Sequence, residues 1–105
     1  MRLSSCLHQY FYEYLPRIKG TSEQSIKAYR QTFSLFLYFL AEHYSIKIKS
    51  LKIEHLTADA LLAFLYHLES DRKNTVQTRN NRLAVIKSFA KMIRFMHPDK
   101  KHIAE

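Results

Sequence analysis

Apolar residues recur at helical spacing in four segments of the chain, and short polar stretches separate them. The segments run from about residue 3 to 15, 22 to 43, 58 to 69 and 76 to 96. An i, i+3, i+4, i+7 repeat places apolar side chains on one face of a helix. The pattern therefore predicts an all-α fold, a compact bundle of four or five helices.

The boundaries of the first two segments carry helix stop and start signals. Pro16 and Gly20 follow the first segment. Proline removes a backbone donor and clashes with the preceding turn, so we expect the helix to end there. The second segment begins at Thr21 or Ser22, and Thr21 with Gln24 three residues later matches a capping box. These signals predict two helices joined by a short turn.

The third and fourth segments are bounded in the same way. Thr57 and Thr75 fit N-cap positions, and Pro98 lies just after the fourth segment. The residues expected to face the core from the third segment are Leu61, Leu62, Phe64, Leu65 and Leu68. We expect one domain over residues 1–97, with residues 98–105 forming a tail or the start of a linker.

Residues 45–56 join the second and third segments, and here isoleucine and leucine alternate loosely with lysine. Such alternation is typical of a strand, but the sequence offers no second strand to pair with it. A lone strand is not stable in water. We therefore expect an extended connection that pins its apolar residues to the core.

Composition narrows the fold class further. The 105 residues include one glycine, two prolines and one cysteine. A β-sandwich or barrel needs more turn residues, and one cysteine excludes an internal disulfide and a cysteine-rich zinc site. No apolar run approaches the ~18 residues of a membrane span. We expect no membrane partner and a location in the cytoplasm.

Charge is the second unusual property of the chain. The 17 Lys and Arg exceed the 9 Asp and Glu, which gives a net charge of +8. Five basic residues and no acidic one lie between residues 76 and 97. The predicted outer face of this helix carries Asn80, Ala84, Lys87, Lys91 and Arg94. Solvated faces usually mix charge signs. A single-sign face suits nucleic-acid phosphates, and the alternatives are a solvated face or an acidic protein partner.

The second segment adds to this charge. Its polar face carries Lys27, Arg30, Gln31, Ser34 and Tyr38, and the 45–56 connection carries three more lysines. If these patches adjoin the fourth segment, they form one cationic groove, but sequence alone leaves that adjacency open.

Four short motifs occur in order along the chain. Residues 22–29 read SEQSIKAY, residues 36–40 read FLYFL, residues 56–59 read LTAD and residues 78–89 read TRNNRLAVIKSF. In this order the motifs resemble the N-terminal core-binding, SAM-like domain of the tyrosine recombinase and phage integrase family. Ser25 stands where that family has threonine, and Asn81 where it usually has arginine.

The resemblance implies that the second and fourth helices approach the major groove of duplex DNA and its flanking phosphates. The DNA-binding candidates that it implies are Ser25, Lys27, Arg30, Thr78, Arg79, Asn80, Arg82 and Lys87. The charge pattern adds Lys91 and Arg94.

The resemblance also implies that catalysis belongs to a second, C-terminal domain with a tyrosine nucleophile. No histidine here is followed three residues later by arginine, and the six histidines form no i, i+4 metal pair. We expect this chain to have no catalytic residue, metal or cofactor, and to be the N-terminal part of a longer recombinase of a bacterial mobile element. Its expected partners are double-stranded DNA, the catalytic domain of the same polypeptide, and further copies on DNA, where it would be nucleoid-associated.

Two other functions remain open from the sequence. One is a helical adaptor that binds an acidic protein. The other is a small helix-turn-helix regulator, in which residues 70–74 form the turn, although the helix that follows is long for a recognition helix.

Overall fold

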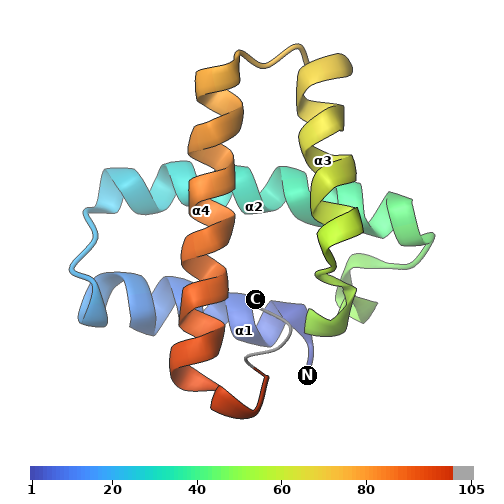
Figure 1. The fold of residues 1–105 in the computed structure, drawn as a ribbon. Coiled ribbons are helices and arrows are strands. Elements are labelled where there is room, and N and C mark those ends of the chain that lie inside the picture. Colours follow the sequence, from blue (N-terminus) through green and yellow to red (C-terminus); the bar gives the residue numbers. More distant parts are fainter. Residues whose placement is uncertain (101–105) are drawn as a thin grey trace.

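Two antiparallel helix pairs cross each other to form the fold (Figure 1). The computed structural model describes residues 1–100. The first pair consists of α1 (Leu3–Gln9), continued by the π-helical η1 (Tyr10–Ile18), and α2 (Glu23–Tyr44). The second pair, α3 (Ala58–Ser70) and α4 (Val76–Met96), lies across the first. A short 3-10 turn, η4 (Pro98–Lys100), follows α4. Among the described residues there is no strand, so the all-α prediction is confirmed.

The prediction that the first helix ends at about Leu15, just before Pro16, is wrong, although the helix does end before Gly20, whose φ is 63°. The helix continues as η1 through Pro16 to Ile18, and the Lys19 N–H then donates to the Tyr14 carbonyl at 2.9 Å. A π-helix bonds each N–H to the carbonyl five residues back, so its turns are wider than those of an α-helix. The ring of Pro16 therefore has more room than in an α-helix, although its missing N–H still removes one helical hydrogen bond.

The capping box predicted at the start of α2 is also wrong. Ser22 is the N-cap, and its Oγ accepts a hydrogen bond from the Ser25 N–H at 3.2 Å. Thr21 belongs to the preceding turn, where its N–H donates to the Leu15 carbonyl at 2.8 Å. Ser22, one of the two predicted starts, is therefore the N-cap, and the incoming turn uses Thr21.

The connection between α2 and α3 is not extended as predicted. It forms two 3-10 turns, η2 (Ile48–Ser50) and η3 (Ile53–His55). Leu51 and Ile53 are both 0% exposed, so the connection does pin apolar residues to the core. The N-terminal segment satisfies its backbone, since the Leu3 N–H donates to the Leu51 carbonyl at 2.9 Å.

Both helices of the second pair have the predicted N-caps, but one residue predicted to face the core from α3 is exposed. The Thr57 hydroxyl accepts from the Ala60 N–H and the Thr75 hydroxyl from the Thr78 N–H, both at 3.1 Å. Leu62, however, is 64% exposed, so its predicted place in the core is wrong. The buried stripe of α3 is centred on Phe64 and Leu68, and the ~100° step per residue turns Leu62 away from it.

A cluster of aromatic rings holds the two pairs together. Phe89 of α4 lies 5.2 Å from Phe33 of α2 and 5.3 Å from Tyr10 of η1, measured between ring centroids. On α3, Phe64 lies 4.7 Å from Phe36 of α2. The crossing of α4 over α2 is therefore fixed by packed rings, and this crossing positions the polar surface described next.

Candidate nucleic-acid interface

The α2 and α4 helices border a shared groove of about 450 Å³ near the crossing. Its walls are Ala28, Tyr29, Gln31 and Thr32 from α2, and Thr78, Asn81, Arg82, Ala84 and Val85 from α4. A small residue stands on each wall, Ala28 on α2 and Ala84 on α4. The structure thus brings together the two helices whose adjacency the sequence left open.

Arg82 is the cation that lines this groove. Its side chain is half-buried, and its Nη1 has no hydrogen-bond acceptor among residues 1–100. Burial lowers the pKa of the Arg82 guanidinium, and the nearby positive charge of Arg72 lowers the pKa further. Arginine nevertheless stays charged in proteins. Arg82 is therefore a partly desolvated cation with spare donors, an arrangement suited to an anionic ligand.

The outer face of α4 adjoins the groove and is cationic. Asn80, Ala84, Lys87, Lys91 and Arg94 are all exposed, as their helical positions predicted. The α4 helix contains no aspartate or glutamate. This face therefore presents donors and positive charge over several turns, uninterrupted by acidic residues of its own helix.

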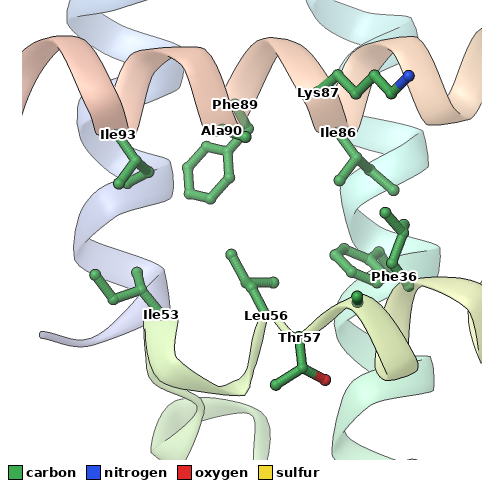
Figure 2. Close-up of a pocket in the computed structure, with 11 residues that line it drawn as sticks. Phe36, Ile53, Leu56, Thr57, Ile86, Lys87, Phe89, Ala90 and Ile93 are labelled. Atoms are coloured by element: carbon green, nitrogen blue, oxygen red, sulfur yellow. The ribbon is translucent and has the colours of Figure 1, made fainter. Parts of the chain in front are cut away.

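An apolar cavity of about 210 Å³ lies behind α4, between α4 and the start of α3 (Figure 2). Leu56 points into it from the connection, opposite Ile86 and Phe89 of α4. Lys87 borders the cavity with its alkyl chain, and its amino group points away from it. The charged end of Lys87 is therefore available on the outer face.

The remaining predicted residues of α2 lie at different places. Lys27 is exposed near the groove end of the helix, and Ser25 sits in the first turn, where its hydroxyl accepts from the Ser22 hydroxyl at 3.0 Å. Arg30 lies on the other edge of α2, with its guanidinium carbon 5.1 Å from the ring centroid of Phe11. A similar distance, 5.3 Å, separates it from the ring of Tyr12. The structure does not bring Arg30 into the groove.

Arg79 faces α3 rather than the groove. Its Nη1 lies 2.9 Å from Glu69 Oε1, and its Nη2 donates to Asn80 Oδ1 at 2.9 Å. The predicted DNA contact of Arg79 thus has a carboxylate partner within the fold.

Comparison with known proteins identifies the fold. The family model described as phage integrase, N-terminal SAM-like domain, matches residues 8–94. The chain belongs to this family. Two relatives from Sinorhizobium fredii carry the name integrase/recombinase. The chain is 37% identical to y4rD over 87 residues, which are 83% of this chain and 31% of the relative. It is 31% identical to y4rC over 97 residues, which are 92% of this chain and 29% of the relative.

This phage integrase SAM-like domain thus spans less than a third of the length of both relatives. No solved structure matches the chain significantly. The family resemblance inferred from the four motifs is confirmed, and it extends over nearly the whole chain.

The lysines of the connection lie apart from the groove of the integrase domain. Lys49 and Lys52 line a separate hollow beside Arg2, and no α4 residue borders it. The described residues therefore do not form a single cationic groove that includes the connection. The charged surface comprises α4 and the adjoining part of α2.

Sequence reasoning missed two residues of this integrase surface. Arg72 lies close enough to Arg82 to influence its pKa, and the polar segment before α4 was the only hint of it. Glu69 holds Arg79 across two helices, and no sequence signal indicates that pair.

Two further groups of residues bear on chemistry. Within residues 1–100, no cluster of three or more His, Cys, Asp or Glu could hold a metal ion. His102 lies outside the described residues.

Cys6 is buried, and burial raises the pKa of its thiol. No helix in the described part of the integrase domain is long and apolar enough to cross a membrane.

Proposed function

We propose that this integrase-family domain binds duplex DNA through the groove between α2 and α4 and the outer face of α4. The observation that carries the proposal is a half-buried Arg82 beside a helix face that has several cations and no acid. A cationic surface attracts DNA mainly by neutralising phosphates and releasing their counterions. Membership of the family supports this assignment, because recombinases act on DNA.

The residues divide into those expected to contact phosphates and those expected to contact bases. Lys87, Lys91 and Arg94 lie on the outer face of α4, where flexible cations can track a phosphate backbone. Lys27, Ser25 and Thr78 stand near the N-termini of α2 and α4, where the positive end of the helix dipole also favours phosphate. Asn80 and Ala84 occupy the N-terminal part of the face, where a short side chain and an amide allow a close approach to base edges.

The integrase/recombinase relatives also support a proposal for the activity of the parent protein. We propose that the parent is a site-specific tyrosine recombinase and that this domain holds one side of the DNA. Another domain of the parent then attacks the scissile phosphate with a tyrosine, and Arg and His stabilise the transition state. On this proposal residues 1–97 form the core-binding domain, and copies of the parent associate on DNA in the bacterial cytoplasm.

A fluorescence-anisotropy titration against a labelled duplex at several salt concentrations tests the proposal. Wild-type affinity should fall steeply with salt, by about 0.9 in the log–log slope for each neutralised phosphate. The double variant Lys87→Glu, Lys91→Glu should lose affinity and show a slope shallower by about 1.8.

The matched control is Lys47→Glu with Lys49→Glu, which changes the net charge equally on the exposed connection. The control should lose much less affinity. Binding that does not depend on salt, or equal losses in the two double variants, would contradict the proposal.

A further inference from the structure

We propose that Glu69 and Arg79 are positioning residues that turn Asn80 into a hydrogen-bond donor towards DNA. The domain would then read an acceptor edge, foremost guanine, at one position of its site. The inference rests on the proposed DNA-binding function and assigns a base preference to it.

The three residues form a chain that runs from α3 across to the outer face of α4. Arg79 Nη1 lies 2.9 Å from Glu69 Oε1, and Arg79 Nη2 donates to Asn80 Oδ1 at 2.9 Å. A guanidinium has only donors, so the amide atom that faces it must be the oxygen. This fixes an orientation that is otherwise ambiguous for asparagine, and it leaves the Nδ2 amino group of exposed Asn80 for a ligand.

The guanidinium of Arg79 has little freedom to move away. Its Nε is buried and has no hydrogen-bond acceptor among residues 1–100, which indicates that the group is packed between α3 and α4. The ion pair itself is partly exposed, with side chains 29% and 42% accessible, and such pairs add little to stability. Its main effect is therefore to orient the neighbouring amide.

This orientation changes which base the amide fits. A free asparagine pairs with adenine by accepting from N6 and donating to N7. With Oδ1 held by Arg79, the amide presents two N–H groups beside a positive charge. These groups disfavour an amino group on the base, because two donors cannot form a hydrogen bond with each other. Guanine offers two neighbouring acceptors, N7 and O6, in the major groove, so Nδ2 can donate to either of them and meets no competing donor there.

Selection from a randomised duplex pool, followed by sequencing, tests the inference with the full 105-residue chain. The wild type should enrich guanine over adenine at one position by roughly tenfold, and Asn80→Ala should lose that preference. Glu69→Gln keeps an acceptor for Arg79, whereas Glu69→Ala removes it. Since both variants remove the same charge, the non-specific affinity changes equally. Only Glu69→Ala should relax the preference and admit adenine.

The outcomes separate this inference from the proposed function. Salt-dependent duplex binding without any base preference would overturn the inference and leave the function standing. A uniform loss of affinity for all sequences in Asn80→Ala would mean that Asn80 contacts phosphate, which also overturns the inference. Equal profiles for the two Glu69 variants would remove the positioning role. Absence of duplex binding would overturn both. Thermal melts of each variant establish that it is folded.

Discussion

Two neighbouring helices, α3 and α4, present opposite surfaces to solvent although they belong to one antiparallel pair. The outer face of α4 carries Lys87, Lys91 and no acidic residue of its own helix. The α3 helix has no lysine or arginine, and its exposed face shows Leu62, at 64% exposure, and Tyr66, at 71%. The net charge of the chain thus says less than its distribution, because the basic residues of this pair lie on α4 and the acidic ones on α3. This uneven distribution of charge distinguishes the α4 surface as the candidate binding surface.

The largest expected effect concerns the aromatic rings of the two helices. Phe89→Ala on α4 removes a fully buried ring that contacts both Tyr10 and Phe33. Unfolding free energy should fall by about 3–5 kcal/mol, as for other buried phenylalanines. Tyr66→Ala on α3 should change it by no more than about 0.5 kcal/mol. Urea denaturation followed by circular dichroism measures both, and similar losses would mean that Tyr66 is packed against the fold.

A smaller effect should separate two of the arginines of α4, Arg82 and Arg79. Arg82→Met removes the half-buried cation of the groove, and the salt slope of DNA binding should become shallower by about 0.9. Stability should hold or rise, because the variant relieves a partly desolvated charge that has no carboxylate partner among residues 1–100. Arg79→Met serves as the comparison. The charge of Arg79 is already paired with Glu69, so the salt slope of DNA binding should change less in this variant. Equal slopes would place both residues in the same role.

The smallest effect distinguishes the helix caps. Thr57→Ala and Thr75→Ala each remove an N-cap hydroxyl, and each should cost about 1 kcal/mol in a thermal or urea melt. Only Thr75→Ala should also weaken DNA binding, because it frays the turn that holds Thr78 at the groove. If Thr57→Ala weakened binding as much, the effect would reflect overall stability rather than the local surface.

Sequence predicted the helices well because their signals are local. The apolar spacing and the hydroxyls of Thr57 and Thr75 are readable within a few residues of each boundary. Pro16 was a misleading signal because the helix changes from α to π at Tyr10, and no local sequence pattern marks that change. Leu62 misled because a nearly continuous apolar helix does not reveal which side is covered.

The candidate surface was predictable only in part. Exposure of Lys87 and Lys91 followed from helical periodicity, which is a property of one element. The groove, the partial burial of Arg82 and the Glu69–Arg79 pair depend on how α3 and α4 lie across α2. Those relations link residues of different helices, so they arise only when the tertiary structure forms.

The crossing of α4 over α2 has a thermodynamic consequence. The groove exists only while the rings of Phe33 and Phe89 hold the two helix pairs together. A ligand that touches both walls therefore binds the folded state and not the unfolded chain. Such a ligand raises the free energy of unfolding by mass action, by about 2.7 kcal/mol at a concentration a hundred times its dissociation constant. DNA would thus be a structural stabiliser of this small domain as well as its target.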